Sequence, residues 1–174
     1  MYFMRDPFPE IESGRKVTRI AVIGIGQSLH GDDNVGLEIL HQWRERFQET
    51  ASRPEVQSEA CELPGLTLLD MLNDVDTAIL VDAVQGKSAP GTIHLLDESE
   101  VSAFTSDAKS AHGWGLAETL QLGNELMVTK TKVKVVGIQV EQMTIGAGLS
   151  KAVKNAVPIA CEMLEEEIHK TLCE

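Results

Sequence analysis

Three carboxylates and one imidazole stand out because of where the sequence puts them. Asp32 and Asp33 follow a Gly-x-Gly turn at the end of an apolar stretch, in IAVIGIGQSLHGDDNVG, and Asp82 ends a second apolar run within VDAV. His112 stands in the glycine-flanked segment SAHGWG. Carboxylate and imidazole donors suit divalent metals, and loops beyond the carboxyl ends of parallel strands meet at one edge of a sheet. The sequence therefore predicts a divalent-metal site at that edge.

Each of these residues also has a purely structural interpretation. Aspartate is a favoured helix N-cap whose negative charge complements the helix dipole, which would explain Asp32 or Asp33. An aspartate at a strand end, such as Asp82, often bonds to its own turn, and His112 would then be an ordinary surface histidine. One aspartate suffices as a cap, however, and the neighbouring glycines let incoming groups approach the backbone. The joint occurrence of these residues on one face favours a site.

The apolar pattern predicts strands that alternate with helices. The run at 17–23 is rich in β-branched residues, which is typical of a strand buried on both faces, and helical spacing begins at Val35. Further strands are expected at 56–63, 77–84, 91–96 and 133–140, and further helices after Pro64 and Gly65, at 116–122 and from Ser150 onward. This alternation indicates an α/β sandwich around a largely parallel sheet.

The last predicted helix carries its apolar residues on one stripe. Glu162 and the run Glu165 to Glu167 are therefore expected to face water. Pro158 is expected to interrupt this helix and kink it, because proline lacks the backbone donor that a helix interior needs.

Length and composition indicate a single domain over residues 1–174. A chain of 174 residues, 43% hydrophobic and 24% charged, can bury a substantial core and matches ordinary globular proteins. Residues 1–15, with Pro7, Pro9 and Gly14, are expected to form an irregular lead-in to a domain at 16–174.

The formal net charge is −12, from 15 basic and 27 acidic residues. This excess disfavours nucleic acid or an anionic membrane as the partner and suits a protein surface or a cation. No apolar run approaches the ~20 residues of a membrane span, and the N-terminus lacks the apolar core of a secretory signal, so a cytoplasmic location is expected. No coiled coil or paired repeat demands an oligomer, and a monomer is expected.

Other polar residues are assigned structural roles. Gly24 and Gly26 resemble the start of a dinucleotide fingerprint, but Leu29 occupies the place of its third glycine. Ser28 lacks the nucleophile-elbow pattern of serine hydrolases. The cysteines are too widely spaced for a zinc or disulfide pattern and are expected to be reduced: Cys61, Cys161 and Cys173. His30 and His41 are expected to face solvent or to cap the acidic segment, and His94 and His169 are expected to be structural.

Four segments resemble, in order and spacing, the motifs of the hydrogenase maturation endopeptidases: GIGQSLHGDDNVG, VDAV with APGT downstream, SAHGWGLAETL and VVGIQVEQM. The resemblance runs from about Val17 to the C-terminal helix, which is much harder to obtain by chance than one short motif. It implies a phosphorylase/hydrolase-like, three-layer α/β/α sandwich with a twisted, mostly parallel five-stranded sheet. The implied activity is removal of the C-terminal extension of a nickel-iron hydrogenase large-subunit precursor after nickel insertion.

The family's metal-contacting residues fall on Asp33, Asp82 and His112, so the resemblance implies that these three are the metal ligands and the catalytic residues. Asp32 is expected to be a helix cap or a support behind the ligands. The implied metal is nickel supplied by the substrate, for which zinc or cadmium would substitute in vitro, and the implied partner is the precursor. Four glycines are expected to shape the backbone around the site: Gly24, Gly26, Gly36 and Gly65.

Three positions depart from the family's usual pattern. Gln27 stands in place of an asparagine, and Asn34 in place of the glycine after the acidic pair. Asparagine tolerates left-handed backbone geometry better than most residues, so the turn is expected to survive. Pro64 replaces a small or polar residue before Gly65. These departures bear on the substrate subgroup.

Three other functions stay open at this point. A non-catalytic maturation factor would bind the large subunit or its nickel without cutting it. A magnesium-dependent phosphate-ester hydrolase would use the acidic pair in octahedral oxygen coordination and would not need His112. A dinucleotide-binding oxidoreductase is disfavoured by the broken glycine pattern.

Overall fold

The computed structural model describes residues 18–62, 64–97, 99–101, 116–126 and 130–174. The predicted lead-in at 1–15 and the candidate ligand His112 lie outside these ranges.

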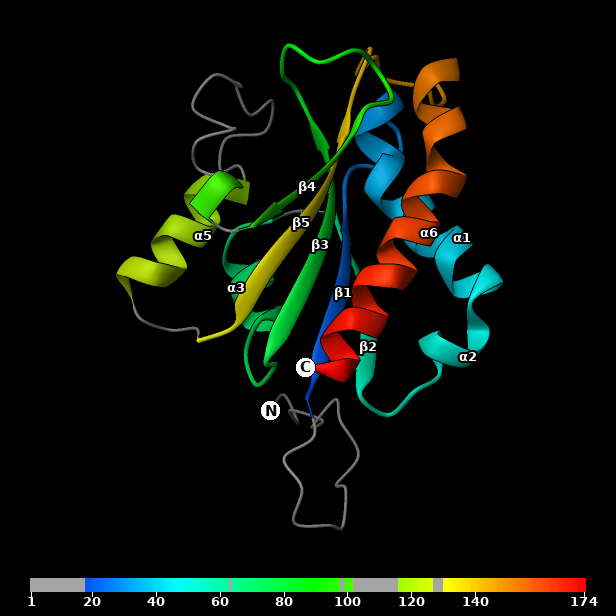
Figure 1. Ribbon diagram of the computed structural model, residues 1–174. Helices are drawn as coiled ribbons and strands as arrows, with labels where there is room; N and C mark the ends of the chain where they lie inside the picture. Colours follow the sequence, from blue (N-terminus) through cyan, green and yellow to red (C-terminus); the bar gives the residue numbers. More distant parts are fainter. Residues whose placement is uncertain (1–17, 63, 98, 102–115, 127–129) are drawn as a thin grey trace, which may run out of the picture.

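Five strands form one sheet in the order β2-β1-β3-β5-β4. The pairs β1–β2, β1–β3 and β3–β5 are parallel, and β4 is antiparallel to β5. The four parallel strands therefore direct their carboxyl ends to one edge of the sheet, the upper edge in Figure 1. The predicted mostly parallel, five-stranded sheet is confirmed. The strands are β1 (Ile20–Ile25), β2 (Val56–Cys61), β3 (Thr77–Val84), β4 (Ile93–Asp97) and β5 (Lys132–Gln139).

Helices cover both faces of this sheet, with α1 and α6 on one side and α3 and α5 on the other (Figure 1). The helices are η1 (Gly31–Asn34, a 3-10 turn), α1 (Val35–Arg46), α2 (Gln48–Ala51), α3 (Leu66–Met71), α5 (Leu116–Glu125) and α6 (Lys151–Cys173). None of the described helices combines the length and the apolar character that crossing a membrane requires.

The central strand β3 shows how the two cores are divided. Ile79 packs among the side chains of α1 and α6, whereas Leu80 packs among those of α3 and α5. Because side chains alternate along a strand, Asp82 shares the α3 and α5 side with Leu80. The strand is buried up to Val81 and becomes half-buried from Asp82 onward, so its fully buried part ends where its acidic residue begins.

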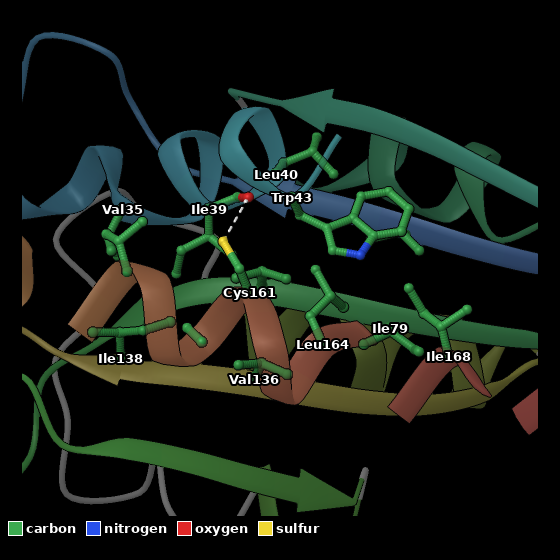
Figure 2. Close-up of a cluster of buried hydrophobic side chains, with 14 of the residues drawn as sticks. Val35, Ile39, Leu40, Trp43, Ile79, Val136, Ile138, Cys161, Leu164 and Ile168 are labelled. Atoms are coloured by element: carbon green, nitrogen blue, oxygen red, sulfur yellow. Dashed lines mark hydrogen bonds between the residues drawn. The ribbon is translucent and has the colours of Figure 1, made fainter. Parts of the chain in front are cut away.

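The core between α1 and α6 is closely packed around Trp43 and Cys161 (Figure 2). The Cys161 thiol donates to the carbonyl oxygen of Ile39 at 3.5 Å, joining the two helices. Burial raises the pKa of Cys161 to about 11, so this thiol stays protonated and unreactive at neutral pH. Cys61 is buried as well, and all three cysteines are thiols rather than disulfides.

Helix α6 runs from Lys151 to Cys173 and continues through Pro158, so the predicted interruption is wrong. Its buried stripe packs along α1 and the sheet on both sides of the proline, and that packing outweighs one missing backbone hydrogen bond. The carbonyl oxygen of Pro158 also accepts a hydrogen bond from the Arg46 guanidinium at 3.1 Å.

The prediction that the acidic residues of α6 all face water is wrong at two positions. Glu167 is buried and forms an ion pair with Lys134 of β5. Glu165 is largely covered and accepts hydrogen bonds from the Trp43 indole at 2.8 Å and the Thr50 hydroxyl at 2.5 Å. Their partners come from distant segments of the chain, so helix periodicity alone does not reveal them.

Candidate metal-binding and catalytic site

The turn η1 places the acidic pair at the carboxyl edge of the sheet, between β1 and the start of α1. Close backbone contacts at two glycines make this possible. A Cβ on Gly36 would lie 2.3 Å from the carbonyl oxygen of Val81, the residue before Asp82. A Cβ on Gly26, whose φ is +155°, would lie 2.0 Å from the carbonyl oxygen of Asp33. Because only glycine fits at both positions, the backbone carrying Asp33 can press against the ends of β1 and β3.

Asp33 and Asp82 are close enough to influence each other's charge. Asp33 is only 8% exposed, and Asp82 is half-buried. Burial raises the pKa of Asp82 to about 7, against the hydrogen bond from the Ala83 amide, and the negative charge of Asp33 raises it further. Two carboxylates in such surroundings resist being ionised together, and a cation between them would relieve the repulsion. The structure thus brings together two of the three predicted ligands.

Asp32 has a different role from the helix cap considered above. It is fully buried, and no side chain caps either η1 or α1. Its carboxylate instead accepts hydrogen bonds from three backbone amides of a distant segment: Glu141 at 2.9 Å, Gln142 at 3.1 Å and Ser150 at 2.6 Å. Its own amide donates to the carbonyl oxygen of Gln142 at 3.0 Å. Asp32 therefore anchors the loop between β5 and α6 to the turn that carries Asp33.

The third predicted ligand, His112, lies outside the described residues. Helix α5 begins at Leu116, four positions later, and Leu116 is buried on the side of the sheet that Asp82 shares. Within the ranges that the structure describes, no group of three or more His, Cys, Asp or Glu side chains is placed to hold a metal. A three-donor site at this edge thus needs a donor from outside those ranges.

Two of the three departures from the family's usual pattern, Gln27 and Asn34, lie in the turn between β1 and α1. Asn34 has a right-handed conformation, with φ −73° and ψ −7°, so the tolerance for left-handed geometry expected of it is not used. The Gln27 carbonyl accepts a hydrogen bond from the His30 amide at 3.1 Å and closes the turn. Position 65 requires glycine, because its backbone φ of +107° is one that other residues rarely adopt.

Other polar groups are separate from this edge. His169 hydrogen-bonds to Glu165 at 3.0 Å, in keeping with the structural role expected for it. His41 faces solvent, as expected, and lies 3.6 Å from Glu45. A pocket of about 250 Å³ opens near the far ends of α1 and α6. Its two arginines are already paired, Arg46 with Glu162 and Arg53 with Glu55. This pocket therefore offers no unneutralised guanidinium to a ligand.

The motif VVGIQVEQM includes the start of the loop between β5 and α6, but its contacts with Asp32 were not expected from the sequence. Glu141, Gln142 and Ser150 meet Asp32 across more than 100 residues of chain, through backbone amides that any residue type would supply. The pairing of aspartates was a signal for such contacts, since a cap needs only one. At least one aspartate of the pair Asp32 and Asp33 was therefore expected to have a role other than capping.

The donor set suits a divalent metal. Asp33 and Asp82 offer carboxylate oxygens from two separate segments, and an imidazole would add a nitrogen donor of the kind borderline metals accept. Three protein ligands leave positions open for a group of the substrate or for water. The raised pKa of Asp82 means that its proton and a metal compete for the same oxygens near neutral pH.

Known proteins resemble this chain in sequence and in architecture. A putative hydrogenase maturation protease of Methanocaldococcus jannaschii is 32% identical over 155 residues, which is 87% of this chain and 97% of that protein. The hydrogenase 2 maturation protease of Escherichia coli is 28% identical over 84% of this chain and 88% of its own length. The solved structure of the E. coli hydrogenase maturating endopeptidase HybD has a TM-score of 0.76 at 26% identity, covering 88% of this chain and 94% of that one.

Fold and site together define an α/β sandwich with a carboxylate pair at the carboxyl edge of a mostly parallel sheet. A family model described as hydrogenase maturation protease matches residues 63–167, which include Asp82 and His112. The chain belongs to the hydrogenase maturation protease family. Asp33 precedes the matched range, so its assignment rests on the motif GDDN and on its position beside Asp82.

Proposed function

We propose that this protein is an endopeptidase that removes the C-terminal extension from a nickel-iron hydrogenase large-subunit precursor after nickel has been inserted. The observation that carries the proposal is the pairing of Asp33 with Asp82 in a member of the hydrogenase maturation protease family. If Asp33 served only as a helix cap, it would not need Asp82 beside it. Nor would a cap explain the raised pKa of Asp82.

Asp33, Asp82 and His112 are the proposed metal ligands and catalytic residues, with Asp32 holding the first of them in place. The two carboxylates supply charge that nickel neutralises, and the imidazole supplies the donor that distinguishes nickel or zinc from magnesium. Gly26 and Gly36 support the site by the close contacts they allow, and Gly24 does so as well, because a Cβ there would lie 2.5 Å from the Gly36 carbonyl oxygen.

Nickel on this proposal belongs to the substrate. A precursor that already holds nickel can complete its coordination with these three side chains, whereas an empty precursor cannot. The loaded form then binds better by the free energy of those metal contacts, and specificity follows from that difference. The enzyme would thereby cut only after the metal has been inserted.

A non-catalytic maturation factor is the second candidate, because the same three donors would also let the protein bind nickel without cutting a peptide bond. The names of the relatives weigh against it, since these are called proteases and endopeptidases. Loss of a peptide from the precursor separates the two functions.

The test is to mix the purified protein with large-subunit precursor, with and without nickel, and to weigh the products by mass spectrometry. We expect loss of a C-terminal peptide in the nickel sample alone. Asp33→Asn and His112→Ala should abolish the cleavage and remain folded. Asp70→Asn and His41→Ala are matched controls at exposed positions and should cleave normally.

Unchanged cleavage by both site variants would refute the assigned roles. Nickel-dependent binding with no change in precursor mass would favour the maturation factor. Cleavage of a phosphate ester with magnesium, indifferent to His112→Ala, would favour the phosphate-ester hydrolase.

A further inference from the structure

The carboxyl edge of the sheet carries the three most exposed large apolar side chains of the described residues. These are Leu29 at 68%, Leu66 at 72% and Ile145 at 75% exposed, and we refer to them as the apolar rim. The other exposed large apolar side chains reach only 44 to 56% and lie on β4, beyond α5 and on α6. Single exposed apolar residues are ordinary, but three gathered around one edge indicate a contact surface.

Hydrogen bonds hold the loops of the apolar rim together. The Gly146 amide donates to the carbonyl oxygen of Leu29 at 2.8 Å, which places Leu29 beside the loop that carries Ile145. The Ser28 hydroxyl donates to the Glu62 carboxylate at 3.4 Å and so ties the first loop to the end of β2, just ahead of Leu66. The apolar rim therefore belongs to connected loops rather than to separate parts of the surface.

The loop that carries Ile145 is also fixed internally. The Gln142 side chain accepts from the Thr144 amide at 2.7 Å and donates to the carbonyl oxygen of Gly148 at 3.1 Å. Asp32 anchors both ends of the same loop through the amides described above. A loop fixed by so many contacts loses little backbone entropy when a partner covers it, which favours binding.

The loops that carry Leu29 and Ile145 hold acidic residues and no basic ones, since the segments 26–34 and 140–150 contain no lysine or arginine. Of their acidic residues, Glu141 is exposed, whereas Asp32 and Asp33 are buried. Glu62 adds a further carboxylate at the neighbouring loop. A complementary partner would present apolar side chains next to lysine or arginine, because such a surface covers the apolar rim and pairs with the exposed carboxylates of Glu62 and Glu141.

We propose that the apolar rim is the docking surface for a segment of the hydrogenase large-subunit precursor that combines apolar side chains with basic neighbours. This inference rests on the proposed function, since it takes the precursor as the partner. The segment lies against Leu29, Leu66 and Ile145 and delivers the nickel-bearing part of the precursor to Asp33 and Asp82. The apolar rim selects the protein, and the carboxylates select its metal state.

The test compares Ile145→Asp and Leu29→Asp with Ile159→Asp, a control on the exposed face of α6. For nickel-loaded precursor, each variant of the apolar rim should raise KM and the dissociation constant about tenfold, the effect of losing one buried aliphatic contact, with a much smaller change in kcat. The control should match the wild type. Ile145→Met keeps an apolar side chain and should bind the precursor like the wild type, unlike Ile145→Asp.

Direct binding of the precursor is measured alongside cleavage, so that the two proposals fail separately. Variants of the apolar rim that bind and cleave like Ile159→Asp would overturn the docking surface and leave the protease intact. A wild type that binds the precursor through the apolar rim without cutting it would overturn the protease and leave the docking surface. Circular dichroism shows whether a variant is misfolded. If Ile145→Asp is misfolded, Ile145→Ser takes its place and should raise KM and the dissociation constant in the same way.

Discussion

At the scale of single residues, Asp82 is the most informative side chain. Its pKa is raised to about 7 because it is buried and because Asp33 lies nearby. A carboxyl group that keeps its proton up to neutral pH in the folded protein destabilises the fold when it is forced to ionise. Such a cost is common at functional sites, where a residue is kept for chemistry rather than for stability.

Replacing this side chain with Asp82→Asn should stabilise the metal-free protein. The folded wild type binds its proton up to pH about 7, whereas the unfolded chain releases it near the ordinary value of 3.8, so wild-type stability falls as pH rises between these limits. Asparagine does not titrate. The gain in the free energy of unfolding should therefore grow over this range and level off above pH 7, at about 1–3 kcal/mol.

Urea unfolding with a chelator present, at pH 5, 6, 7 and 8, measures this gain. Asp70→Asn on the exposed side of α3 serves as the control and should show no such trend. A gain that is equal at pH 5 and pH 8 would contradict the raised pKa of Asp82. The same Asp82→Asn protein should have lost its cleavage activity.

Asp32 makes a different prediction, because its role lies in its hydrogen bonds. Asp32→Asn removes the charge from an acceptor of three backbone amides and turns a donor toward them. The free energy of unfolding should fall by about 2–3 kcal/mol. Hydrogen exchange should accelerate first at the amides of Glu141, Gln142 and Ser150, whereas unchanged protection at these amides would show that Asp32 does not anchor the loop.

At the scale of elements, the first turn of α1 is set against the sheet by its glycine. Gly36→Ala would bring a Cβ to 2.2 Å from the Ile25 carbonyl oxygen and 2.3 Å from that of Val81, so α1 must move away. We expect a loss of about 3 kcal/mol or more in the free energy of unfolding, and loss of cleavage even where the protein stays folded.

Gly148→Ala is the matched control for this glycine, because a Cβ there meets nothing within 4 Å. Its free energy of unfolding should change by less than about 0.5 kcal/mol. Thermal unfolding of the two variants side by side makes the comparison. Equal melting temperatures would mean that the close approach of α1 to the sheet is unnecessary.

The elements themselves could largely be predicted from the sequence. Runs of β-branched residues gave β3 its predicted bounds, Thr77–Val84, and helical spacing correctly began α1 at Val35. These patterns are local, since they record which side of each element is buried. Boundaries were less exact: the predicted run covers 17–23, whereas β1 spans Ile20–Ile25.

The candidate site could be predicted only in part. Asp33 and Asp82 were expected together because strand ends meet at one sheet edge, and the structure brings them together. The contacts of Asp32 and the burial of Glu167 depend on partners more than 30 residues away, which no local pattern records. Pro158 inside α6 shows the same limit, because tertiary packing overrides the local rule.

At the scale of the whole molecule, the buried pair between Lys134 and Glu167 joins the sheet to α6. Burial alone would raise the pKa of Glu167, but the hydrogen bond and the charge of Lys134 outweigh it, and the pKa is lowered. The pair therefore adds stability above the ordinary glutamate pKa and loses that contribution as the pH falls through the lowered value.

Lys134→Met should leave Glu167 charged and buried without its main partner, at a cost of about 3–5 kcal/mol in the free energy of unfolding. Adding Glu167→Met should recover most of that loss, since two apolar side chains replace the pair. Lys132→Met breaks the exposed ion pair with Glu174 and should cost less than about 1 kcal/mol. Chemical unfolding of the four proteins tests this, and a double variant as unstable as Lys134→Met would contradict it.

We propose that two acids distant in sequence, Asp33 and Asp82, share a single ion with the imidazole of His112. Crystals of the full chain grown with nickel, measured with X-rays on both sides of the nickel absorption edge, locate every bound nickel directly. We predict one ordered ion bonded to Asp33, Asp82 and His112 at ~2.0–2.2 Å. Nickel bound elsewhere, or held at this edge without either carboxylate or without the imidazole, would contradict it.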